Sequence, residues 1–493
     1  MTPAAGFRKE RLGWVFGLSA VQLAACTAAW VPVVGAMSAQ KYRFALVWLP
    51  VAVLIVLLAT VPIKGRVAVT WLTHWVRHTT GTAAGWSTWQ SKAAAGLPVA
   101  PSDPDLPGVL TRFRLPDGPV LGEHGRVCLT HDTVDDRWGA TARLTFSGVG
   151  LISTAECASL GEAMGNLAVG LGASRRVNRF SLYLRTVPDD GTRYTAYRQR
   201  NRIEQVPELV ATSAEQMSRL TGAASVLTEA FIHVSAKESV LAARAKDSGG
   251  GVAGRGYALY PSLTGLTEPL SAMGVDAPQW LTSEGVAEAL RTGFCPADAG
   301  TLARRHLGGH GGLPLAVAGP NRATNTERVY YHDGYATVSY TVMMSGLSLP
   351  FGALAPLMTV RTAGERRCLA VHYEVIDAHK ARTIAKRERQ HTTGMRTIKH
   401  SKGFGVAAED TKAMKSAQRQ ENAVASGHAL LRIAVVVSTT VPADWKVEEH
   451  ADGLHNDIVA RFVPLRQDLV QDSAFVAACI PLGVGLHNVR GEF

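Results

Sequence analysis

The sequence has few charged residues, and it lacks the motifs of nucleotide-driven and nucleophilic enzymes. Asp, Glu, Lys and Arg make up 18% of its 493 residues, below the roughly 25% of an average globular domain. No Gly-Lys dipeptide occurs, which excludes a Walker A loop, because that lysine must reach the nucleotide phosphates. A Gly-x-Ser-x-Gly elbow and a Cys-His signature are also absent. A P-loop ATPase is therefore excluded, and the motif-defined hydrolases are disfavoured.

The cysteines form no recognisable framework. None is part of a Cys-x-x-Cys pair, and their spacing matches neither a disulfide scaffold nor a zinc site. The six residues are Cys26, Cys128, Cys157, Cys295, Cys368 and Cys479. Scattered thiols are typical of a reducing compartment. The apolar fraction of 46% is ample for buried cores, and the length allows about two to four domains.

Three short patterns carry possible chemistry, and each has a simpler interpretation. Gly249–Gly254 matches Gly-x-Gly-x-x-Gly but follows a polar run rather than a strand, so we interpret it as a flexible loop. His306 and His310 are four residues apart, but the glycines between them weaken a helix, so we expect a turn rather than a metal site. His332-Asp333 is interpreted as a turn pair. We predict no catalytic residue, metal or cofactor.

The net charge of +11 is concentrated in two segments. Residues 1–100 carry +8, residues 378–426 carry +7, and the rest of the chain carries −4. The protein is therefore not generally basic, and each basic segment needs its own explanation.

Two charge-free runs near the N-terminus predict membrane spans, near 14–37 and 44–63. About 20 apolar residues suffice to cross the hydrocarbon core as a helix. A cleaved signal peptide is the alternative for the first run, but its apolar stretch is too long for one and a second run follows at once. A buried soluble hairpin is the alternative for both.

Seven of the ten tryptophans lie in the first 89 residues. Tryptophan favours the membrane interface, where a flat apolar ring meets water. We predict interfacial positions for Trp14, Trp30, Trp48, Trp71 and Trp75. Trp71, Trp75 and Arg77 follow the second span at helical spacing, which predicts an interfacial helix. The alternative, packing on the soluble domain, is most plausible for Trp86 and Trp89.

Flanking Lys and Arg residues weakly favour both ends of the hairpin in the cytoplasm. The N-terminal tail holds three, the loop between the spans two, and the segment after the second span includes Lys64, Arg66 and Arg77. We therefore predict a two-pass protein of the inner (plasma) membrane with most of the chain in the cytoplasm.

Alternating apolar residues after the hairpin predict an α+β fold made of mixed α/β sandwich domains, the last ferredoxin-like. Strands are expected near 125–130, 139–147, 176–187, 226–235, 328–345, 366–376, 429–440 and 461–466. Helices are expected near 155–172, 206–224, 283–293, 445–459 and 468–479. The predicted organisation is a membrane hairpin with interfacial helix (1–95), a Pro-rich linker (96–110), a first domain (111–245), a Gly-rich loop (246–275) and a second domain (276–486). No long internal sequence repeat is evident.

The second basic segment, 378–426, predicts a helical hairpin with a basic tip, broken by glycines. We expect it to contact an acidic protein, anionic lipid or DNA phosphate, the alternative being a merely solvated helix face. Phe404 is its only aromatic residue, so single-strand recognition by stacking is poorly supported. The candidate contacts are Lys380, Arg382, Lys386, Arg387, Arg389, Arg396, Lys399 and Lys402.

Several short patterns, taken together, resemble the actinobacterial conjugation membrane proteins of type IV secretion systems. They are Leu106-Pro107-Gly108-Val109-Leu110, Phe294-x-Pro296, Tyr331-His332-Asp333-Gly334, Ala417-Gln418-Arg419-Gln420-Glu421 with Gly427-His428, and Leu465-x-x-Asp468 followed by Gln471-x-x-Ala474-Phe475 and Pro481-Leu482-Gly483. The resemblance covers most of the chain and is strongest over 366–486. The chain departs from it at Cys295, where an acid is expected, and in the Gly-rich stretch 246–275.

The resemblance implies a small two-span VirB-type subunit fused to the non-ATPase N-terminal domain of the conjugation ATPase, with the motor on a separate protein. We therefore expect a non-enzymatic structural component of a conjugative DNA-transfer apparatus. Its expected partners are a separate P-loop ATPase, other inner-membrane secretion subunits, the lipid bilayer and further copies of itself, with direct DNA contact left open. The alternatives are an EccE-like subunit of a type VII protein secretion system and, with less support, a membrane-tethered enzyme.

Overall fold

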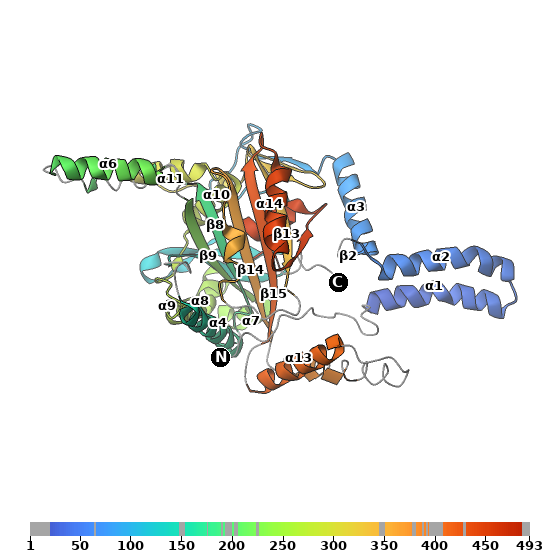
Figure 1. Cartoon of the computed structure of the whole chain (residues 1–493). Coiled ribbons are helices and arrows are strands. Elements are labelled where there is room, and N and C mark those ends of the chain that lie inside the picture. The colour runs from blue at the N-terminus through green and yellow to red at the C-terminus, as the bar shows by residue number, and fades with distance from the viewer. Residues whose placement is uncertain are drawn as a thin grey trace.

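A computed structural model gives the fold of the chain (Figure 1). It describes residues 20–63, 66–146, 153–174, 176–188, 191–192, 200–201, 206–222, 226–344, 351–376, 381–386, 389–390, 393, 408–426 and 430–485. The class is mixed α/β with one large antiparallel sheet, as the α+β prediction requires at its coarsest level.

Two apolar helices project from the body and pack on each other (Figure 1). They are α1 (Ala20–Ser38) and α2 (Tyr42–Thr60). Ala29 and Val33 pack against Ala52, and the Trp48 indole donates to the Ala29 carbonyl at 3.1 Å. Among the described residues, only α2 is both long and apolar enough to cross a membrane, since the apolar part of α1 that meets the same test for composition, Gln22–Ser38, is shorter.

A third helix, α3 (Ala68–Ala83), follows α2 through the short paired strands β1 (Pro62–Ile63) and β2 (Arg66–Val67). It runs across the direction of the α1–α2 pair rather than along it (Figure 1). Strand β3 (Thr88–Gln90) then joins the edge of the main sheet by pairing with β11 (Arg322–Asn325). The segment that follows the apolar helices therefore joins the sheet through a hydrogen-bonded strand and not through an unpaired linker.

The Pro-rich segment 96–110 lies against the body. Leu106 and Leu110 are buried in the core, and Asp105 accepts a hydrogen bond from the Lys92 backbone N–H at 2.6 Å. The chain enters the sheet region through the 3₁₀ turn η1 (Gly108–Arg112). The end of this segment is thus packed on the core, whereas residues 96–98 and 100–103 are exposed.

Fourteen strands of the described residues form the main sheet. Besides β3 and β11 they are β4 (Phe113–Arg114), β5 (Asp117–Val120), β6 (Arg126–Asp132), β7 (Arg137–Leu144), β8 (Arg179–Pro188), β9 (Val226–Lys237), β10 (Gln279–Trp280), β12 (Tyr330–His332), β13 (Tyr335–Met343), β14 (Arg366–Ile376), β15 (Leu430–Pro442) and β16 (Val463–Arg466). Their order is β3-β11-β12-β13-β15-β14-β8-β9-β7-β6-β4. Strands of both predicted domains belong to this sheet, because β8 pairs with β14.

The strand order is the same when read outward in both directions from the β8–β14 pair. On one side come β9, β7 and β6, and on the other come β15, β13 and β12. The short strand β10 adds to the outer edge of β7, as β16 adds to that of β13. The fold therefore contains two equivalent halves, which the sequence does not reveal as a repeat.

Helices cover both faces of the sheet. One face packs against α4 (Thr154–Ser174), α7 (Glu238–Asp247), α8 (Gly251–Thr264) and α9 (Thr267–Ser271) in the first half, and against α14 (Val447–Val459) in the second. The opposite face packs against α10 (Ser283–Phe294) and α15 (Gln471–Cys479). Helix α11 (Asp298–Leu307) follows α10.

The predicted loop at 246–275 is wrong, because most of this segment is the helices α8 and α9. Its glycines serve close packing. A Cβ on Gly254 would lie 2.3 Å from the Ala245 carbonyl oxygen of α7, and one on Gly256 would lie 2.4 Å from Pro119. Gly249, Gly250 and Gly251 have positive φ and form the turn between α7 and α8. The Gly-x-Gly-x-x-Gly match is therefore a helix junction.

Two helical arms leave the sheet. One lies between β8 and β9 and contains α6 (Glu208–Gly222); the other lies between β14 and β15 and contains a short helix at 381–386 and α13 (Ala408–Ala425). Because β8 and β14 are antiparallel neighbours, their C-terminal ends lie at opposite ends of the sheet. The two arms therefore leave from opposite ends (Figure 1).

Replacing Gly254 with alanine tests the packing of α7 on α8. We expect a loss of about 1–3 kcal/mol, because the new Cβ overlaps a backbone carbonyl that cannot rotate away. The matched control is Gly165→Ala in α4, where nothing lies within 4 Å and helix propensity favours alanine. The melting temperature of the full chain in detergent is the measurement. Equal melting temperatures for the two variants would contradict the packing.

Candidate functional site

The predicted basic contact set lies only partly within the described residues. Arg382 and Lys386 are exposed on the short helix at 381–386, and Arg389 pairs with Glu421 of α13 at 2.9 Å. Lys380, Arg387, Arg396, Lys399 and Lys402 lie outside the described residues. The described part of the arm thus places cations on its surface and pairs one of them internally.

The predicted interfacial tryptophans belong to the apolar helices. Trp30 is exposed on α1, Trp48 is half-buried between α1 and α2, and on α3 Trp75 is exposed while Trp71 is half-buried. Trp14 lies outside the described residues. Trp89 packs against the body core, whereas Trp86 is 79% exposed. Of Trp86 and Trp89, only Trp89 therefore packs on the folded body, which was the alternative to an interfacial position.

Helix α10 ends inside the protein, where buried side chains bind its last carbonyl groups. Arg366 of β14 donates to the Thr292 and Gly293 carbonyls, each at 2.7 Å. Arg185 of β8 donates to the Ala289 carbonyl at 2.8 Å. A helix leaves its last four carbonyls without partners, and its C-terminus favours cations. The fully buried Arg366 meets both requirements, and Arg185, also fully buried, adds a second cation one turn before the end of the helix.

His332 completes this cap. Its Nδ1 lies 2.6 Å from the Phe294 carbonyl oxygen, which can only accept, so Nδ1 donates and Nε2 accepts from the Thr337 hydroxyl at 2.8 Å. The neighbouring Asp333 has a positive φ of 43° and pairs with Arg291 at 2.8 Å. Asp333 therefore belongs to a turn, as predicted, whereas the prediction is wrong for His332, which is the buried last residue of β12 and joins that strand to α10.

Helix α15 ends on the same face of the sheet in the same way. His372 lies 3.0 Å from the Ala477 carbonyl, Arg185 donates to the Cys479 carbonyl at 3.1 Å, and the Thr141 hydroxyl donates to the Pro481 carbonyl at 2.7 Å. The Tyr183 hydroxyl accepts from the Gly483 N–H at 2.9 Å. We call the side chains of the sheet that bind these helix ends the polar face; they are Thr141, Tyr183, Arg185, His332, Arg366 and His372. The sequence showed their strands but not this role.

Burial keeps the histidines of this region neutral. It lowers the pKa of His332 to about 3, with the Arg366 charge acting in the same direction. It lowers the pKa of His372 to about 4 and that of His233, which faces Thr141, to about 3. Neutral rings can both donate and accept, as His332 and His372 do here.

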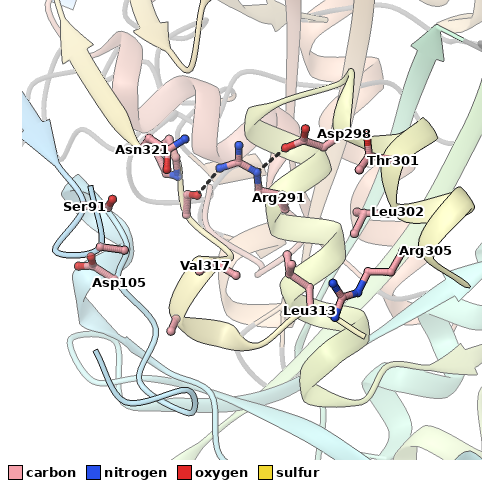
Figure 2. A pocket seen from close by; sticks show the side chains of 14 residues that line it. Ser91, Asp105, Arg291, Asp298, Thr301, Leu302, Arg305, Leu313, Val317 and Asn321 are labelled. Atoms are coloured by element: carbon pink, nitrogen blue, oxygen red, sulfur yellow. Dashed lines mark hydrogen bonds and ion pairs between the residues drawn. The ribbon is translucent and has the colours of Figure 1, made fainter. Parts of the chain in front are cut away.

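A surface cavity of about 260 Å³ lies beside α10 and α11 (Figure 2). Leu302, Leu313 and Val317 line it, with Arg305 at one side. Arg291 is held between Asp298 at 2.5 Å and the Gly319 carbonyl at 2.8 Å (Figure 2). Because these partners and Asp333 engage its guanidinium, Arg291 serves as a structural tie and not as an anion receptor.

No group of three or more potential metal ligands occurs among the described residues. The Nε2 atom of His306 instead lies 2.8 Å from the Glu288 carboxylate, a contact that joins α11 to α10. The described surface therefore presents apolar helices, a basic arm and a small cavity.

Searches for relatives found no match, either among protein-family models or among curated proteins.

Acidification should destabilise the protein through the three buried histidines. In the unfolded chain each has a pKa near 6.5, so stability is present above that pH and is lost as pH falls toward the folded-state values of 3 to 4. Each histidine should contribute a slope of about 1.4 kcal/mol per pH unit below pH 6.5.

We therefore expect His332→Gln to flatten the dependence of melting temperature on pH between 7 and 5. Glutamine retains a donor for the Phe294 carbonyl but cannot take up the proton. The control is His310→Gln, which changes an exposed residue. An unchanged slope for His332→Gln would show that this histidine is not held neutral.

Proposed function

We propose that the protein is a non-enzymatic, membrane-anchored structural component of a type IV secretion-like conjugative DNA-transfer apparatus, and that it docks a separate ATPase. The carrying observation is an apolar helix pair that projects from a folded α/β body and is joined to it by a strand. The assignment to conjugation depends on the family resemblance. A type VII secretion subunit remains the alternative, since it would also combine two spans with a cytoplasmic domain.

The surface of the helix pair supports membrane insertion. Large apolar side chains stand exposed along both helices, and Leu46, Val47 and Val31 are among the most exposed. Exposed apolar patches of this extent are rare on soluble monomers and mark membrane or protein contacts. The pair is proposed to span the inner membrane twice, with the body in the cytoplasm.

Helix α3 supports an interfacial position next to the spans. Val69, Leu72, Trp75 and Val76 are exposed on one side of α3, whereas Arg77 lies on the other side at helical spacing. A helix of this kind lies in the membrane surface with its apolar side down. Because α3 crosses the direction of α1 and α2 (Figure 1), a spanning pair would place α3 in the membrane plane.

The body is held to this membrane unit at several points. Besides the β3–β11 pair, the Ser91 N–H donates to the Asn321 carbonyl at 2.9 Å, and the Asn325 N–H donates to the Ser87 carbonyl at 2.7 Å. Burial raises the pKa of Asp472 in α15, and hydrogen bonds from Ser473 oppose that rise, with a smaller contribution from the charge of Arg77 in α3. A scaffold needs such fixed coupling, because it must hold its partners at a set position relative to the bilayer.

Charged substitutions in α2 should release the protein from membranes. We expect the double variant Val53→Asp with Leu54→Asp to leave the membrane fraction, since each acid in mid-span costs about 2.5–3.5 kcal/mol. Flotation in a density gradient after an alkaline wash is the measurement, because aggregates sediment instead of floating. The control places the same two acids at Leu209 and Val210, exposed on α6. Floating of both variants would argue against α2 as an anchor.

Docking of an ATPase is tested by crosslinking in the native cell. Tagged full-length protein, crosslinked and purified in detergent, should carry an identified protein with a Walker A sequence. A tagged, unrelated two-span protein controls for abundance. Recovery of small secreted substrates without any ATPase would favour the type VII alternative, and recovery of neither would contradict both.

A further inference from the structure

The two arms are equivalent in topology but differ in charge. Residues 189–225, between β8 and β9, contain five basic and five acidic side chains, whereas residues 378–426, between β14 and β15, carry +7. Each arm connects two neighbouring antiparallel strands, β8 to β9 or β14 to β15, and these two strand pairs occupy equivalent places in the two halves of the sheet. A common folding role would not require this difference, so the charge of the β14–β15 arm reflects what it contacts.

The arms also point in different directions. In Figure 1, α6 extends away from the apolar helix pair, while the described part of the β14–β15 arm runs on the side of that pair and along its direction. If α1 and α2 span the membrane, the basic arm faces the bilayer and the neutral arm faces away from it. This step rests on the proposed membrane anchoring.

The described part of the basic arm is a paired-helix structure. Ala381, Ala385 and Val424 are buried together with Ile376 of β14, and Ile384 and Leu430 pack against them. The apolar sides of the two helices thus face each other. Arg382, Lys386, Lys415 and Arg419 are exposed, so the cations form the outer surface of the arm.

We propose that the β14–β15 arm binds anionic lipid headgroups of the membrane that α1 and α2 enter. Clustered Lys and Arg residues beside a membrane anchor are attracted to anionic lipid, each contributing about fivefold in affinity. The outer surface of the described arm offers charge without the exposed aromatic anchors typical of protein interfaces. Stacking of single-stranded nucleic acid is also disfavoured, since Phe404 is the one aromatic residue in 378–426.

The experiment measures how close the arm lies to the headgroups of a bilayer that holds the full chain. A fluorescent noncanonical residue replaces Gln418, exposed on α13, or as a control Thr212, exposed on α6. Liposomes contain phosphatidylcholine alone or with phosphatidylglycerol, plus a headgroup-linked acceptor dye. We expect energy transfer from position 418 to rise with phosphatidylglycerol and to fall with added salt. Transfer from position 212 should stay low.

A variant of reduced charge, with Arg382, Lys386, Lys415 and Arg419 each changed to Gln, should lose most of the rise at position 418, because the net charge of residues 378–426 falls from +7 to +3. Transfer at 418 that does not depend on lipid charge would overturn the proposal. The proposal would also be overturned if transfer at 418 stayed low until a DNA duplex or an acidic protein was added. That partner, and not lipid, would then hold the arm in place. Flotation of the same liposomes reports anchoring separately, so loss of arm binding with intact flotation leaves the proposed anchoring standing.

Discussion

The C-termini of α10 and α15 both end inside the protein, and one face of the sheet supplies the donors that their carbonyl groups need. Arg185 serves both helices, donating to the carbonyls of Ala289 and Cys479. A buried polar group without a partner costs about 1–3 kcal/mol. Several such groups together would cost as much as the whole stability of a typical domain, about 5–15 kcal/mol. The position of these helices and the composition of the sheet face therefore depend on each other.

This constraint also explains why the two halves form one body. Arg185 lies in β8 of the first half and Arg366 in β14 of the second, and both donate to the same helix, α10. Separating the halves would break the β8–β14 pair and also leave buried arginines and carbonyls without partners. The arms and the apolar helices are thus attached to a single sheet, which sets their directions relative to one another.

The sequence predicted the elements well and their assembly less well. Alternating apolar residues located β8, β14 and β15 to within a few residues, because a strand with one apolar face has a period of two. The alternation is the same whether the polar side of a strand faces water or faces buried helix ends. The burial of Arg185 and Arg366 was therefore not predictable. The order of strands was likewise hidden, because pairing β8 with β14 depends on residues about 190 apart in sequence.

The same limit applies to the candidate surfaces. The Gly-rich segment 246–275 suggested a loop because glycine weakens helices, yet Gly254 and Gly256 are required there by the close approach of α7 and β5. The apolar helices and the basic segment were predictable, since each is a continuous run whose composition alone carries the signal. The directions in which the apolar helices and the basic segment leave the body could not be predicted, because they depend on the sheet to which both are attached.

These directions distinguish the two ends of the body. The sheet fixes the neutral arm on the side away from the apolar helices (Figure 1), and α6 exposes Leu209, Val210 and Met217 there. If α1 and α2 span a membrane as proposed, a cytoplasmic partner would meet this side first and the basic arm would be turned toward the bilayer. Apolar side chains on the outward arm suit contact with protein, and cations on the inward arm suit contact with lipid headgroups. Under the proposed anchoring, two equivalent halves related by one antiparallel strand pair would give the body one membrane side and one partner side.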